Sequence, residues 1–146
     1  MTGRGFLGTQ ASWAADLNLI AQVVLLVLLT VAVLRAKKGD LATHHTWMTV
    51  VVIVNAVLIV AVMNPTFFRV LPAALSDPAL EPKMMLPHLL VGGLAELLGL
   101  YAVVAVRMDL PLGSQAHSQR RFMRVLAILW TLALVGGIAL YALWYL

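Results

Sequence analysis

The sequence predicts an all-α integral membrane protein, a four-helix bundle whose N-terminus and C-terminus both lie outside the membrane. Hydrophobic residues make up 62% of the 146 residues and charged residues only 11%, a composition far from that of soluble domains. Four apolar runs are each about long enough to span a bilayer. As a single domain over residues 1–146, the chain is expected to form helices over about 17–34, 44–63, 88–106 and 115–146.

The first apolar run is expected to remain in the mature protein as a transmembrane helix. Only Arg4 precedes the run, and a basic cluster from Arg35 to Lys38 follows it, which is the reverse of a secretory signal. Asn18 and Gln22 lie one helical turn apart and mark one polar face near the start of this helix.

The second helix is expected to begin with Thr43 as its N-cap, with His44 and His45 in its first turn. It is followed by 24 residues, Asn64–Pro87, that contain five prolines. Five prolines exclude one continuous helix, and a connection of this length is more often functional than passive.

The third helix carries His88 at its entrance and Glu96 near its middle, where a carboxylate costs several kcal/mol unless it is protonated, paired or wetted. Small residues such as Gly92, Gly93 and Gly99 let a neighbouring backbone approach closely. This helix is therefore expected inside the bundle. Ser114 is the expected cap of the fourth helix.

The distribution of charge predicts the orientation. Residues 35–40 and 107–124 together hold seven Lys/Arg and two Asp, whereas the N-terminus and residues 64–87 hold three basic and three acidic residues. The positive-inside rule then places both termini and the proline-rich connection outside. The protein is expected to be a multi-pass protein of the cell membrane, in bacteria the cytoplasmic membrane, in contact with membrane lipids.

Histidines at the starts of the second and fourth helices form one candidate cofactor site. His45 and His117 fall on the cytoplasmic side and could together ligate a haem b or a metal. Arg120 and Arg121 could meet haem propionates. The alternative is that these side chains contact lipid headgroups at the interface.

A second candidate site lies at the opposite face, about 24 Å away at 1.5 Å per helical residue. His88 is there with Met84 and Met85, and Met63 is within possible reach. Imidazole and thioether ligands suit Cu(I). The alternative is an interfacial histidine among methionines that only fill space.

Asn55 and Glu96 are expected at similar depth on antiparallel helices, as an intramembrane polar pair. A hydrogen bond between them would lower the cost of burying the carboxyl group. A carboxyl that relays protons or contacts a quinone is the functional alternative.

No motif indicates an enzyme. The chain has no cysteine, which excludes disulfides, thiolate metal sites and c-type haem attachment. Walker, HExxH and Ser/His/Asp signatures are absent, and nothing indicates a nucleic-acid partner.

Several short motifs occur in an order that resembles the CtaM-like family of small four-helix membrane proteins. They read FLGT…ADLNLI, VLRAKKGD, THHTWM, PHLLVGGLA and HSQRRFM…LW…GGIALY. Members are associated with maturation of haem-copper terminal oxidases. The resemblance implies a non-enzymatic maturation role with a terminal oxidase as partner, and haem or copper as a possible cofactor.

The family pattern can be carried over to this chain residue by residue. Its positions correspond to Leu17-Asn18, His45 with Met48, His88, and His117 with Trp130. Glu96 and the doubled His44-His45 depart from the pattern, and the spacing from His117 to Trp130 is slightly long. The departures keep an alternative open: an accessory or haem-b-carrying subunit of a respiratory or photosynthetic electron-transfer complex.

Overall fold

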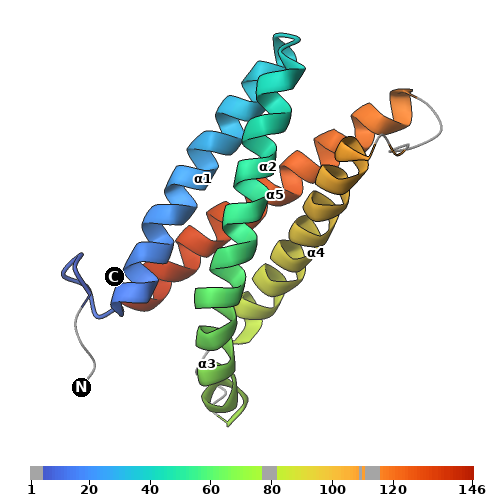
Figure 1. Ribbon diagram of the computed structural model, residues 1–146. Helices are drawn as coiled ribbons and strands as arrows, with labels where there is room; N and C mark the ends of the chain where they lie inside the picture. Colours follow the sequence, from blue (N-terminus) through green and yellow to red (C-terminus); the bar gives the residue numbers. More distant parts are fainter. Residues whose placement is uncertain (1–4, 77–81, 109, 111–115) are drawn as a thin grey trace.

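The computed structural model describes residues 5–76, 82–108, 110 and 116–146, without the side chains of residues 70, 73–76, 82–84 and 116–118. The described residues form helices and no strand. The elements are α1 (Trp13–Lys37), α2 (Leu41–Leu58), the π-helix η1 (Ile59–Met63), α3 (Asn64–Ser76), α4 (Pro82–Arg107) and α5 (Ala116–Tyr145) (Figure 1).

Four helical segments are long and apolar enough to cross a membrane: Trp13–Lys37, Leu41–Arg69, Met85–Arg107 and Gln119–Tyr145. The predicted all-α fold with four membrane-spanning helices is therefore confirmed. Both ends of the chain lie at the same end of the bundle, which we call the termini end; the opposite end, where α1 turns into α2, is the loop end (Figure 1). That the termini end faces outside stays a prediction.

Two helix starts differ from those that the sequence predicted. α1 begins at Trp13 rather than near residue 17, because the Ser12 hydroxyl accepts a hydrogen bond from the backbone N–H of Ala15 at 3.2 Å. The N-cap of α2 is Asp40 and not Thr43, so that prediction was wrong. The Asp40 carboxylate accepts from the backbone N–H of Thr43 at 3.1 Å, which is the bond that an N-cap makes.

The proline-rich connection is largely helical, which the sequence did not predict. α3 follows η1 without a break and contains Pro72, while Pro87 lies inside α4. Pro82 is the first residue of α4, where a missing N–H costs no intrahelical bond. Pro65 comes one residue after the π-helix η1, and the helix continues through it. The sequence predicted that prolines break the helix within this connection. A break between α3 and α4 would fall in residues 77–81, which lie outside the described residues.

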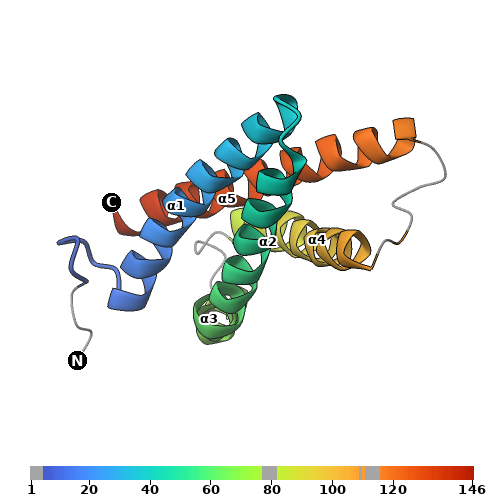
Figure 2. The same cartoon turned by 45° about the horizontal axis from the view of Figure 1, so that its top comes forward.

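The four spans pack as two crossed helical hairpins. α1 packs on α2 and on α5, and α4 packs on α5 and on α2, so that α2 and α5 lie diagonally opposite. Figure 2 shows the α1–α2 hairpin crossing the α4–α5 pair instead of running parallel to it (Figure 2). The start of α5 lies apart from the start of α2 in both views.

The core sits where the hairpins cross, and Trp130 is its largest fully buried side chain. The indole packs against the bare backbone of Gly99: a Cβ on Gly99 would lie 3.0 Å from Trp130 Nε1 and 3.1 Å from Val52 Cγ2. Gly99 thus makes room for the side chains of Trp130 and Val52, whereas the sequence predicted that small residues in α4 admit a neighbouring backbone. Outward-facing side chains such as Val27 and Leu97 are exposed and apolar, as contact with lipid requires.

Gly99→Ala should destabilise the protein relative to Gly93→Ala. The added methyl group at Gly99 overpacks the core, at a cost of about 1–3 kcal/mol. At Gly93 a Cβ meets nothing within 4 Å, so Gly93→Ala is a matched control on the same helix. Reversible unfolding in mixed micelles measures both free energies, and equal stabilities would show that the indole is not held tightly in this notch.

The start of α2 should lose stability at low pH. Thr43, through its side chain and its backbone N–H, and then Arg35 hold the pKa of Asp40 below its usual value of 3.8. Because the pKa is lower in the folded protein, the stabilisation is complete above the unfolded value and is lost as the pH falls through the folded one. Between pH 5 and pH 2.5 the midpoint temperature of thermal unfolding should therefore fall more steeply for the wild type than for Asp40→Asn, which keeps a capping side chain. Parallel curves would contradict this role of the carboxylate.

Candidate functional site

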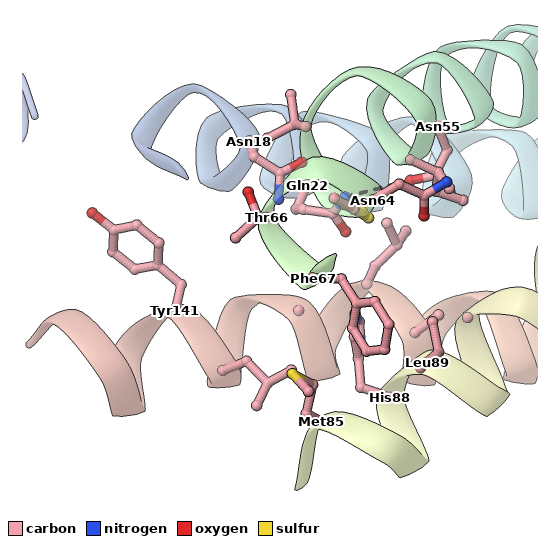
Figure 3. Close-up of a pocket in the computed structure, with 18 of the residues that line it drawn as sticks. Asn18, Gln22, Asn55, Asn64, Thr66, Phe67, Met85, His88, Leu89 and Tyr141 are labelled. Atoms are coloured by element: carbon pink, nitrogen blue, oxygen red, sulfur yellow. Dashed lines mark hydrogen bonds between the residues drawn. The ribbon is translucent and has the colours of Figure 1, made fainter. Parts of the chain in front are cut away.

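A pocket of about 210 Å³ lies in the half of the bundle next to the termini end, between the two hairpins (Figure 3). Its polar side chains come from α1, α2, α3, α4 and α5. They include Asn18, Gln22, Asn55, Asn64, His88 and Tyr141. Figure 3 shows Asn18 and Gln22 on one wall, facing His88 and Met85 on the other.

The pocket has no fixed charge. Among the described residues that line it, none is Asp, Glu, Lys or Arg. Apolar and aromatic side chains, Phe67 and Trp130 among them, make up the remaining wall. An apolar cavity with a few placed polar groups is the usual form of a small-molecule site. A ligand with a charged head would find no counter-ion here.

Local structure explains how the wall of α1, η1 and α3 is built. Asn18 and Gln22 are one turn apart and therefore share a helix face. The neighbouring segment η1 ends with a hydrogen bond from the backbone N–H of Asn64 to the carbonyl oxygen of Ile59, five residues earlier. Such a π turn shifts the helix face that follows it and is frequent at functional sites. Here Asn64 and Phe67, just after it, line the pocket.

His88 fits against two glycines of α5. A Cβ on Gly136 would lie 3.1 Å from His88 Nδ1, and a Cβ on Gly137 would lie 3.4 Å from both His88 Cε1 and Gln22 Oε1. The two glycines therefore make room for the imidazole and for the Gln22 amide at the same level of the pocket.

A buried chain of hydrogen bonds joins three helices behind the pocket. Gln22 Nε2 donates to Asn55 Oδ1 at 3.4 Å, and Asn55 Nδ2 donates to Glu96 Oε2 at 2.9 Å. The predicted bond between Asn55 and Glu96 is thus present, and both side chains are buried. The sequence did not predict that Gln22 joins them. The amides of Gln22 and Asn55 reach the pocket, whereas Glu96 is not among the residues that line it.

Several buried polar atoms have no hydrogen-bond partner within the described part of the chain. They are Asn18 Oδ1, His88 Nδ1, Trp130 Nε1 and Glu96 Oε1. The first three belong to residues that line the pocket. Unpaired buried polar atoms are uncommon in native proteins and indicate strain, a missing water or a missing ligand.

Asp16 lies beside the pocket, bonded to the lining residue Tyr141, and the sequence alone indicated no role for it. Its fully buried carboxylate accepts bonds from the backbone N–H of Leu7 at 2.8 Å and from the Tyr141 hydroxyl at 2.5 Å. Thr9 Oγ1 also lies 2.9 Å from Tyr141 Oη. The N-terminal turn is thereby fastened to the end of α5. The signal for this role was an acid one turn into an otherwise apolar run.

Of the candidate site at the loop end, the structure describes the side chains of His45, Arg120 and Arg121. His45 is exposed, and its ring centroid lies 5.5 Å from that of His44, with the ring planes tilted by 59°. His44 Nδ1 lies 2.9 Å from the carbonyl oxygen of Ala32. Arg120 and Arg121 are exposed, and the side chain of His117 lies outside the described residues. α2 and α5, which would supply the two histidines, lie diagonally opposite.

The haem b site stays a prediction, because the side chain of His117 lies outside the described residues. Among the described residues that line the pocket at the termini end, His88 is the one imidazole and none is a cation that could meet the propionates.

Three of the ligands predicted for copper lie in the pocket. His88, Met85 and Met63 all line it, while the side chain of Met84 lies outside the described residues. An imidazole that binds a metal normally hydrogen-bonds through its other ring nitrogen. Among the described residues, His88 Nδ1 has no such partner. The Cu(I) site stays a prediction.

Asn55→Leu should destabilise the bundle by about 1–3 kcal/mol, because Gln22 Nε2 and Glu96 Oε2 would both lose their buried partner. Glu96→Gln should be nearly neutral, since its amide oxygen accepts the same bond. Thr30→Val, at an exposed site on α1, serves as the control. Unfolding in mixed micelles measures all three. If Glu96→Gln abolishes function in a folded protein, the carboxyl group has a chemical role.

Comparison of the chain with protein-family models, curated proteins and solved structures finds no match.

Proposed function

We propose that this protein is a non-enzymatic maturation factor of a haem-copper terminal oxidase, and that it works by binding a neutral amphipathic small molecule in the pocket. One observation carries the proposal. Asn18, His88 and Trp130, three of the positions behind the resemblance to the CtaM-like family, come from three different helices and all line this pocket. Residues so far apart in sequence have no local reason to meet.

The chemistry of the pocket supports binding rather than catalysis. Its wall offers amides, hydroxyls and one imidazole, and the carboxyl groups of Asp16 and Glu96 are engaged in hydrogen bonds beside it. Neutral hydrogen-bonding groups in an apolar wall orient a ligand without drawing in ions. The apolar outer faces of the helices let such a ligand arrive from the lipid.

Deletion of the gene in its native host should lower terminal oxidase activity, and the wild-type gene should restore it. Gly93→Leu should not restore it. Gly93 lines the pocket, and a Cβ there meets nothing within 4 Å, so the larger side chain fills the cavity without a clash at its base. Leu97→Met, on the exposed side of the same helix, is the control and should restore activity.

Oxidase activity in membranes and the amount of each variant, measured by immunoblot, decide the outcome. Full restoration by Gly93→Leu at normal protein level would contradict a working role for the pocket. The mature oxidase, once purified, should not contain this protein. A stoichiometric amount in the mature complex would instead identify an accessory subunit.

A further inference from the structure

We propose that a groove between α1 and α5 at the loop end binds one anionic phospholipid, with an acyl chain along the groove and the phosphate between two basic side chains. The groove is separate from the pocket at the termini end, and no described residue lines both. The inference does not rest on the proposed function.

The crossing of the hairpins creates the groove. α1 and α5 pack on each other, and the two helices diverge toward the loop end (Figure 1, Figure 2). The space between them there is about 350 Å³. Its walls include the apolar side chains of Leu29, Val33, Leu34, Ala127, Ile128 and Leu132. Because Leu34, Ile128 and Leu132 are exposed, a lipid chain can enter the groove from the side.

The two hydroxyl groups in the walls have no free proton to offer a ligand. Thr30 Oγ1 donates to the carbonyl oxygen of Leu26, and Thr131 Oγ1 donates to that of Ala127, each at 2.8 Å. Both bonds stay within one helix, so they need no partner across the groove. The walls therefore suit a hydrocarbon chain, since a polar ligand would lose its bonds to water there without replacing them.

The groove ends in positive charge at the loop end. Lys37 of α1 lines it. On α5, Arg124 comes one turn before Ile128 and lies on the same side of the helix. Both basic side chains are exposed, and neither forms an ion pair among the described residues. The carboxylate of Asp40 is paired with Arg35 at 3.6 Å, so both cations are available to an anion.

Apolar walls that end between two cations match an anionic phospholipid. Ammonium and guanidinium groups donate to phosphate oxygens, and basic sites between transmembrane helices bind anionic lipid heads. A zwitterionic phospholipid brings a cation of its own to Lys37 and Arg124, and it should bind more weakly. A free phosphate gains nothing from the apolar walls. The pocket at the termini end has the opposite character, because no cation is among its described lining residues.

Native mass spectrometry of the full-length protein in detergent micelles should measure the binding of three probes. They are dioleoylphosphatidylglycerol, dioleoylphosphatidylcholine with the same chains, and glycerophosphoglycerol, which is the anionic head without chains. Phosphatidylglycerol should bind roughly 10- to 100-fold more tightly than phosphatidylcholine, because each of the two basic residues contributes roughly a three- to tenfold preference. The head without chains should not bind at the same concentrations.

Variants of the two helices test the assignment of each part of the lipid. Lys37→Gln and Arg124→Gln should each weaken binding of phosphatidylglycerol roughly three- to tenfold and leave phosphatidylcholine nearly unchanged. Lys38→Gln removes the same charge from an exposed neighbour that does not line the groove, and it is the control. Thr131→Phe fills the groove and should weaken binding of both lipids. Val135→Phe, one turn further along α5 at an exposed site, should not.

Equal affinities for the two lipids, or equal losses for Lys37→Gln and Lys38→Gln, would overturn the site, because they indicate only a general attraction to the membrane surface. Unchanged lipid binding by Thr131→Phe would overturn it as well, since the acyl chain would lie elsewhere. So would a dimer that Thr131→Phe dissociates, because the groove would then be an interface between two copies of the chain. If Thr131→Phe does not fold, the charge variants at exposed sites still decide the outcome. The oxidase activity of the Gly93→Leu variant tests the proposed function separately.

Discussion

The hydrogen-bonded chain from Gln22 through Asn55 to Glu96 is the constraint on which the rest of the bundle depends. Lipid provides no partner for a polar group, so each of these side chains must find one inside the protein. Meeting that requirement brings α1, α2 and α4 together at one depth. The apolar core around Trp130 then packs directly beside this level, against the notch at Gly99.

The pocket is a consequence of how that level is built. The two hairpins cross there, and toward the termini end they leave a pocket with polar side chains on both walls. Gly136 and Gly137 leave space for His88, and the π turn η1 directs Asn64 and Phe67 into the same space. The Asp16–Tyr141 bond beside it ties the N-terminal turn to α5. Space and unpaired polar atoms thus occur together, as expected of a ligand site.

The two ends of the bundle differ in chemistry in a way that bears on function. The loop end carries exposed basic and histidine side chains, which suit contact with lipid headgroups. α2 and α5, which begin at this end, do not pack on each other. The half next to the termini end gathers the uncharged polar groups. The proposed binding role would account for the finding that three of the positions behind the family resemblance, Asn18, His88 and Trp130, line one cavity.

The sequence by itself determined the class of fold, the four spans and the pairing of Asn55 with Glu96, because hydropathy and the cost of a buried carboxyl group act locally. It missed the helical content of residues 64–76, because prolines usually interrupt a helix whereas Pro65 and Pro72 both lie within α3. It also placed the N-cap of α2 at the wrong residue. Only the tertiary structure decided which histidines have neighbours. His45 and His88 look equally suitable in the sequence, but in the structure His45 is exposed, whereas His88 lines the pocket and lies against Gly136 and Gly137 of α5. Which side chains meet across a bundle depends on helix order and crossing, and neither is written in the periodicity of a single helix.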